Sequence, residues 1–456
     1  MSSAALHTDV VQVPHQPAIP RVGVRLPRIA ILFCSLSLIF LPEYAQSLGD
    51  ISAKNPLYHT VVGGFRLIDV LVLLSGISAC FALGCSRDRL FCFPRRLAVL
   101  LAAFAVAIGI SALYGIEHGG QNLCFDWRAI ALGVAFYFVY RLCIQTAFDM
   151  GTAISVFGML VALRVGSSSV SYVLGNGANI LGLRIPLFDG PSLSAIVFAS
   201  LLATSLSACD PDSRRRWLWL LLSGAAILLV ALCFRRTYWA ELAIGLVLLA
   251  TTARGHRLRS LAVPLFAAAI AFAVLGSSLT ERLSSVDFTR DDAPYGEDNP
   301  DHVGDILDAW TQVRTSPVMG IGLGRSYETW HIRQWKDESV MVHNAPLHVW
   351  LKYGLFGLAV YLAYHFCLFQ SLRGQARSAT PLPRAVLNSV LAYLAAQFVV
   401  SLGFTPWPYS AVQSTNLIAF LLAVAFVREP LCHYQASPSL RPLTTRRHIS
   451  LTQSPA

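Results

Sequence analysis

Long apolar runs separated by short polar breaks follow one another along most of the chain. A helix that spans a membrane needs roughly 20 mostly apolar residues, and many of these runs have about that length. The pattern predicts an all-α polytopic membrane protein with about twelve transmembrane helices. The predicted spans cover residues 29–41, 61–83, 97–114, 129–148, 150–166, 190–208, 217–234, 238–252, 260–276, 346–368, 386–404 and 411–427.

The first apolar run has two interpretations. It is short, and the Ala-Gln-Ser sequence at residues 45–47 resembles a signal-peptidase site, so a cleaved signal is an alternative to a first span. Both interpretations leave the next residues on the outer side of the membrane.

The composition supports the same class of protein. Of 456 residues, 55% are hydrophobic and 13% are charged, which excludes an ordinary soluble globular protein. The net charge of +10 could indicate a nucleic-acid partner, but the arginines lie in short clusters between apolar runs, as topology signals do. The ten cysteines are scattered and no pair has metal-ligand spacing, so we expect no metal, no cofactor and no disulfide framework.

The charge of the polar breaks predicts which of them lie inside the cell. With the N-terminus inside, most arginine clusters, and Arg141 near the inner end of the fourth predicted span, fall on the inner side. The outer loop 115–127 has no Lys or Arg, and the long outer loop 277–345 is acidic on balance. Both termini are therefore predicted to be cytoplasmic. The predicted segments are a disordered tail (1–28), a bundle of about nine spans (29–276), a long outer loop with short helices (277–345), three last spans (346–427) and a second tail (428–456).

One pair of arginines departs from this charge pattern. Arg235 and Arg236 fall in the outer turn 234–241, between the seventh and eighth predicted spans. A charge held at that depth is costly and is usually paired or functional. An interfacial pair, or a contact with Glu241, is the structural alternative, and our preferred hypothesis is that the pair binds an anionic ligand.

The long outer loop contains three further features. Residues 301–313 have apolar positions at helical spacing, which predicts an amphipathic helix. Three glycines follow and allow close backbone approach just before Arg325, without the spacing of a dinucleotide-binding motif. These glycines are Gly320, Gly322 and Gly324.

His343 and Asn344 stand where the chain re-enters the bilayer. A histidine at this boundary can act as a general base for a hydroxyl, because its pKa lies near neutral pH. A histidine that only caps the following helix is the structural alternative.

Taken together, these motifs resemble the O-antigen ligase and polymerase family of bacterial envelope glycosyltransferases. The resemblance is carried by His343-Asn344 followed after nine residues by Gly354 and Gly357, by the preceding sequence 317–324 (PVMGIGLG), and by the arginine turn upstream of the long loop. It covers roughly residues 190–430. It implies a multi-pass protein of the bacterial inner membrane that transfers a glycan from undecaprenyl diphosphate to an acceptor hydroxyl on the periplasmic face.

The resemblance also implies roles for individual residues. His343 would activate the acceptor hydroxyl, and Arg235 or Arg236 would hold the donor diphosphate, for which a planar guanidinium is well suited. Arg325 and Arg282 are weaker candidates for the same diphosphate. Asn344, the three glycines and Glu241 would support the site, without a metal. The ligase motif has Glu four residues after Arg, whereas Glu241 lies five residues after Arg236, which leaves open which arginine matches.

Three alternatives to a ligase remain at this stage. A ligase transfers to the lipid A core and a polymerase of the same family transfers to another repeat unit, and both use the same donor. A non-enzymatic transporter of lipid-linked glycans would usually concentrate its charges at the bilayer midplane and often show internal repeats. A metal-dependent oligosaccharyltransferase would require paired carboxylates in the first outer loop, where Glu43 and Asp50 are not adjacent.

Overall fold

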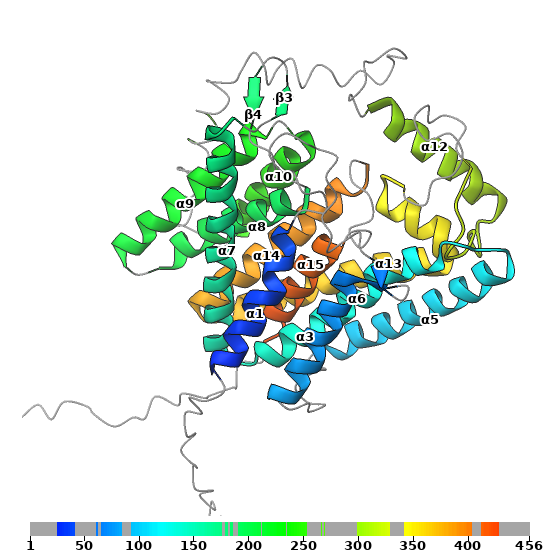
Figure 1. The fold of residues 1–456 in the computed structure, drawn as a ribbon, viewed down its shortest axis with the longest axis horizontal. Helices are drawn as coiled ribbons and strands as arrows, with labels where there is room; N and C mark the ends of the chain where they lie inside the picture. Colours follow the sequence, from blue (N-terminus) through cyan, green and yellow to red (C-terminus); the bar gives the residue numbers. More distant parts are fainter. Residues whose placement is uncertain are drawn as a thin grey trace, which may run out of the picture.

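The protein is a bundle of helices with two very short hairpins, as seen in the computed structural model (Figure 1). The structure describes residues 25–41, 61–62, 65–83, 93–175, 178–180, 183–185, 190–210, 212–233, 235–252, 266, 269, 299–328, 342–403 and 412–427. Its helices are α1 (Arg25–Phe40), α3 (Leu67–Leu83), α5 (Arg95–Glu117), α6 (Leu123–Cys143), α7 (Ala147–Val173), α8 (Gly190–Cys209), α9 (Ser213–Leu232), α10 (Arg236–Thr252), α12 (Asn299–Thr315), α13 (Ala345–Ser378), α14 (Pro381–Val400) and α15 (Val412–Ala425).

The predicted fold class, an all-α polytopic membrane protein, is confirmed. Among the described residues, six helices are long and apolar enough to cross a membrane, namely α5, α7, α8, α9, α13 and α14. Three shorter apolar helices belong to α1, α3 and α15. Eleven of the twelve predicted runs overlap a helix, and the run 260–276 lies almost entirely outside the described residues. The number of spans and the division into tails, bundle and loop therefore stay predictions.

Two boundaries differ from the sequence-based prediction. The second run begins with a hairpin, β1 (Val61–Val62) against β2 (Phe65–Arg66), and the helix starts only at Leu67. A second hairpin, β3 (Ala178–Ile180) with β4 (Leu183–Ile185), precedes α8.

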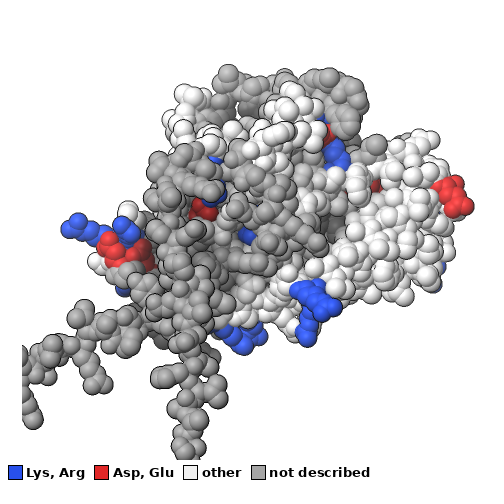
Figure 2. Space-filling view, turned by 90° about the horizontal axis from the view of Figure 1, so that it is seen from below, with Lys and Arg blue, Asp and Glu red and all other residues white. Residues whose placement is uncertain are grey.

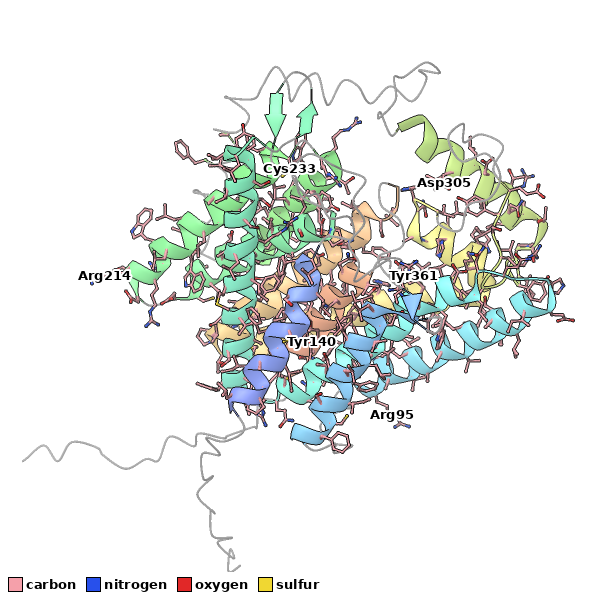
Figure 3. The ribbon with its side chains drawn as sticks, viewed as in Figure 1. Arg95, Tyr140, Arg214, Cys233, Asp305 and Tyr361 are labelled. Carbon is pink, nitrogen blue, oxygen red and sulfur yellow. The ribbon has the colours of Figure 1, made fainter. Side chains whose placement is uncertain are left out.

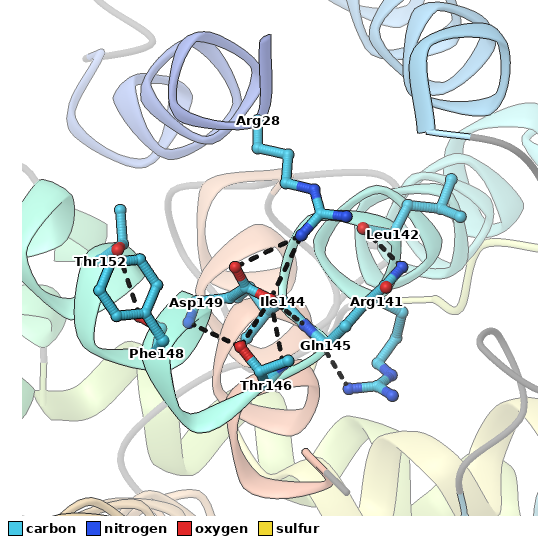
Figure 4. Close-up of polar contacts among 9 residues, drawn as sticks. All are labelled: Arg28, Arg141, Leu142, Ile144, Gln145, Thr146, Phe148, Asp149 and Thr152. Atoms are coloured by element: carbon cyan, nitrogen blue, oxygen red, sulfur yellow. Dashed lines mark hydrogen bonds and ion pairs between the residues drawn. The ribbon is translucent and has the colours of Figure 1, made fainter. Parts of the chain in front are cut away.

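The boundary between the fourth and fifth runs lies earlier than predicted. A capping box begins α7: the Thr146 side chain accepts the Asp149 backbone N–H, and the Asp149 carboxylate accepts the Thr146 N–H (Figure 4). Arg28 of α1 also donates to Asp149 at 3.4 Å. Arg141, near the inner end of the fourth predicted span, is buried in the last turn of α6, where it donates to the carbonyl oxygens of Ile144 at 3.0 Å and Ala423 at 3.3 Å. A helix C-terminus leaves carbonyls without intrahelical partners, and this guanidinium satisfies one of them.

Helix α8 lies at the centre of one part of the bundle. Its sequence is rich in Ser and Ala, which allows neighbouring helices to approach closely. It packs against α9, α10 and α14, and the Thr204 hydroxyl bonds to that of Ser223 on α9 at 2.6 Å. By contrast, most of α5 and α9 is exposed, with large apolar side chains, as expected for lipid-facing helices. In Figure 2 most of the described surface on this face carries neither acidic nor basic side chains.

Candidate functional site

His343 lies just before α13 and is held by a buried carboxylate. Its ring Nδ1 lies 3.0 Å from Oδ2 of Asp305, and its backbone N–H donates to the same oxygen at 2.6 Å. The Asp305 side chain is 3% exposed, whereas that of His343 is 38% exposed. Asp305 belongs to α12, where this helix approaches the start of α13 (Figure 3). The helix predicted in the outer loop is thus present as α12, but Leu307 and Trp310 of its predicted apolar face are exposed, and its buried face presents Asp305 to the histidine.

Asn344 joins the start of α13 to the end of α14. Its side-chain oxygen accepts the Leu347 N–H at 2.9 Å, which caps α13, and its amide donates to the Leu402 carbonyl. The next residue, Ala345, donates its N–H to the Ser401 carbonyl at 2.8 Å. These bonds fix the point where the chain enters α13 against the C-terminal end of α14.

The glycine run packs its backbone against three helices. Gly320, Gly322 and Gly324 all have positive φ, and the run lies against α5, the start of α6 and α13. The Leu323 N–H donates to the Ser111 carbonyl of α5 at 3.1 Å, and the Gly324 carbonyl accepts the Asn122 N–H at 2.8 Å. The expected close backbone approach is therefore what the run provides.

A break in α13 completes this packing. Gly354 has φ 69° and ψ −172°, which interrupts the helix. The Leu351 carbonyl then accepts the Ile321 N–H at 2.7 Å, and the Leu355 N–H donates to the Val318 carbonyl at 3.1 Å. In an unbroken helix these two groups would bond to each other. The loop thus satisfies the backbone groups that the break exposes, as irregular backbone at membrane depth requires.

A buried ion pair lies beside the glycine run. Nζ of Lys352 on α13 is 2.9 Å from Oδ2 of Asp126 on α6, and the two side chains are 0% and 5% exposed. Asp126 Oδ2 also accepts the Gly324 N–H at 2.8 Å, and Lys352 donates to the Arg325 carbonyl at 2.5 Å. The Arg325 guanidinium itself makes a 3.5 Å contact with the Ile321 carbonyl. Within the described residues, Arg325 therefore contributes to the packing of the glycine run through its backbone carbonyl.

The arginine turn belongs to a second group of polar residues. Arg236 begins α10, and Arg235 precedes it with an exposed side chain. Glu241 on α10 is buried and accepts from the Ser194 hydroxyl of α8 at 3.3 Å. Among the ion pairs between described residues, none joins Glu241 to either arginine, so the suggested contact with Glu241 is not found there.

The last turn of α14 connects the two groups. Ser194 also bonds to Tyr393 at 2.8 Å and contacts Gln397 at 3.4 Å, both on α14. Ser401 lies four residues after Gln397, about 6 Å further along the axis, and its carbonyl holds the N-terminus of α13. The Glu241 group and the His343 group therefore flank the end of one helix. Arg282 lies outside the described residues.

Several residues of this region were not assigned a role from the sequence. Asp305 stood in the acidic loop, but nothing in the pattern paired it with His343, 38 residues later. Lys352 could have been selected from the sequence, because it interrupts the apolar run 346–368. An ionisable residue at such a position indicates a partner or a function. Asp126, its partner, lies 226 residues away in sequence.

The arrangement can support proton transfer at a partly exposed imidazole. A neutral histidine that donates Nδ1–H to a carboxylate keeps a lone pair on Nε2, which can take a proton from a hydroxyl. Within the described ranges, no group of three or more His, Cys, Asp or Glu side chains could hold a metal ion.

Fold and geometry together define an all-α polytopic membrane protein with a histidine–carboxylate pair beside a bundle of apolar helices. No protein-family model matches the chain, and no curated protein matches it. A chain of a solved peptidoglycan synthase complex, from work on the coordination of polymerization and crosslinking, is similar over 72% of this chain and 96% of that chain, at 20% identity and a TM-score of 0.41. A likeness this weak carries no argument about fold or activity, so the function is argued from the residues.

Proposed function

We propose that the protein is a membrane glycosyltransferase of the O-antigen ligase and polymerase type. It moves a glycan from an undecaprenyl-diphosphate-linked donor to an acceptor hydroxyl on the periplasmic face of the inner membrane. The observation that supports this best is the His343–Asp305 pair at the start of α13, in which the carboxylate is buried and the histidine side chain is partly exposed. A histidine held in this way is suited to general-base catalysis on a hydroxyl.

In the proposed reaction, the acceptor oxygen attacks the anomeric carbon of the donor sugar while its proton passes to Nε2 of His343. The bond between that carbon and the diphosphate oxygen breaks, and the electron pair leaves with the lipid diphosphate. Arg236, with Arg235, binds this diphosphate, because guanidinium groups match phosphate oxygens in geometry and charge. Glu241 of α10 bonds to Ser194 of α8, which contacts Gln397 of α14, and the end of α14 holds the start of α13, an arrangement that supports this division of roles.

With the lipid A core as acceptor, the protein is a ligase. A polymerase of the same type uses a second repeat unit as acceptor and the same donor. Deletion of the gene followed by electrophoresis of surface glycans separates them: loss of all core-attached polymer indicates a ligase, and core that bears a single repeat indicates a polymerase. Loss of free polysaccharide alone indicates a role in exopolysaccharide synthesis.

The direct test uses purified protein in vesicles with a donor labelled in its glycan. We expect the label to appear on the acceptor and undecaprenyl diphosphate to be released in equal amount. Intact donor that crosses the vesicle membrane without a new glycosidic bond would contradict the proposal and indicate a transporter. We expect Arg236→Ala to abolish transfer, because it removes a guanidinium proposed to bind the donor diphosphate. Arg215→Ala, at an exposed site of α9, is the matched control and is expected to transfer normally.

A further inference from the structure

Asp305 is a buried carboxylate, and both of its oxygens accept hydrogen bonds. Oδ1 accepts from the hydroxyl of Tyr327, and Oδ2 accepts the backbone N–H of His343 and faces its ring Nδ1. With 3% of the side chain exposed, solvent contributes little to its solvation. A buried carboxylate must be compensated by hydrogen bonds or by charge, and here the donors come from Tyr327 and His343.

The residues packed around Asp305 fix the orientation of its carboxylate. Ala309 and Val313 of α12 form an apolar cluster with Tyr327, Leu347 and other side chains of α13 and the glycine run. The ring of Tyr327 is 0% exposed within this cluster, so its hydroxyl holds Oδ1 from a fixed position. The other oxygen, Oδ2, is thereby directed at His343.

Asp305 contacts two groups of the same residue, the backbone and the ring of His343. Because Asp305 binds both the backbone N–H and the ring Nδ1 of His343, it restrains the main chain and the side chain together. An ionised carboxylate can only accept hydrogen bonds, so the ring nitrogen that faces it carries the proton. The other nitrogen, Nε2, is then left with its lone pair.

We propose that Asp305 is the positioning residue for His343: it selects the Nδ1–H tautomer, orients the imidazole and leaves Nε2 to take the acceptor proton, with Tyr327 holding the carboxylate in place. This inference rests on the proposed transferase function for its catalytic consequence. When Nε2 has taken the proton, the imidazolium lies against the carboxylate, which stabilises its positive charge. The proton then leaves to water as the site is reset.

The tautomer can be measured without any enzyme assay. Nitrogen-15 NMR of the full chain in detergent reports which ring nitrogen of each histidine carries a proton, and His343→Gln identifies the signal of His343 among the 12 histidines. We expect protonated Nδ1 and unprotonated Nε2 for neutral His343. A neutral His343 with its proton on Nε2 would overturn the proposal, whatever the protein does.

The catalytic consequence is tested with Asp305→Asn and Tyr327→Phe. We expect Asp305→Asn to lower kcat by about 10²-fold and Tyr327→Phe by about ten-fold, with KM for the donor nearly unchanged, because a positioning residue acts on the chemical step. Asp149→Asn is the matched control: it removes the charge of another partly buried, ion-paired aspartate, in the capping box of α7, and should leave kcat unchanged.

The outcomes separate this inference from the proposed function. If the unaltered protein transfers no glycan, the proposed function fails even when NMR finds the Nδ1–H tautomer. If His343→Ala still transfers glycan, the role of His343 as base fails, and the catalytic role of Asp305 fails with it. If His343→Ala is inactive and Asp305→Asn is fully active, only the role of Asp305 is overturned. Should Asp305→Asn fail to fold, Tyr327→Phe, which removes a single hydroxyl, and the tautomer of the unaltered protein still decide the question.

Discussion

At the scale of single residues, the sequence indicated the functional candidates better than their partners. A histidine at a re-entry point and arginines at an outer turn are visible in one chain, because each departs from an apolar or charge pattern. Their partners are not visible, since Asp305 and Asp126 meet His343 and Lys352 only through folding. Burial, which makes these contacts strong, is a property of the fold and not of any local motif.

The first residue-scale prediction concerns the proposed base. His343→Ala is expected to lower kcat for glycan transfer by about 10² to 10⁴-fold, the usual contribution of a general base, while membrane insertion stays normal. His118→Ala, at an exposed turn in another predicted outer loop, is the matched control and should keep full activity. Normal turnover by His343→Ala would remove this residue from the mechanism.

A second residue-scale prediction concerns the buried ion pair. Lys352→Met leaves the Asp126 carboxylate buried without its cation, and we expect a loss of about 3–5 kcal/mol in the free energy of unfolding. Arg128→Met breaks the more exposed pair with Asp69 and should cost less. Thermal unfolding in detergent measures both. The double variant Lys352→Met with Asp126→Leu should regain part of the loss, and no recovery would show that the pair is not the cause.

At the scale of elements, most helices could be predicted from the sequence. Apolar length alone marks a spanning helix, and period 3.6 marks α12. The boundaries were predicted less well. The capping box of Thr146 and Asp149 that begins α7 is a local motif that the apolar pattern alone does not reveal. The burial of Arg141 at the end of α6 depends on a contact with another helix, at the Ala423 carbonyl. Gly354 belongs to the motif that carries the family resemblance. That it breaks α13, and why, follows only from the loop that hydrogen-bonds to the helix there.

The element-scale prediction compares two glycines of α13. In Gly354→Ala the added Cβ would lie 2.0 Å from the Val318 carbonyl oxygen at a φ of +69°, so the loop must shift, and we expect a lower melting temperature and lost activity. Gly374→Ala meets no atom within 4 Å and should raise stability by about 0.5–1 kcal/mol, as in an ordinary helix. Equal melting temperatures for the two variants would contradict the proposed role of the break.

At the scale of the whole molecule, the orientation in the membrane is a prediction from charge. Glu117 stands at an exposed turn that should face the periplasm, and Arg215 at an exposed helix start that should face the cytoplasm. In a cysteine-free variant, Glu117→Cys should react with an impermeant thiol reagent in intact spheroplasts. Arg215→Cys should react only after lysis, and the opposite pattern would reverse the topology.

The packing of the glycine run against α5 and α13 also affects how the protein is assembled during synthesis. The Ser111 hydroxyl of α5 donates to the Lys352 carbonyl at 2.6 Å, and these residues lie 241 positions apart in the chain. During synthesis α5 and α6 are therefore in the bilayer long before their partners leave the ribosome. Contacts between such distant segments form late and slowly. We expect the histidine site to mature only after translation ends, so a nascent chain stalled before α13 would be inserted but inactive.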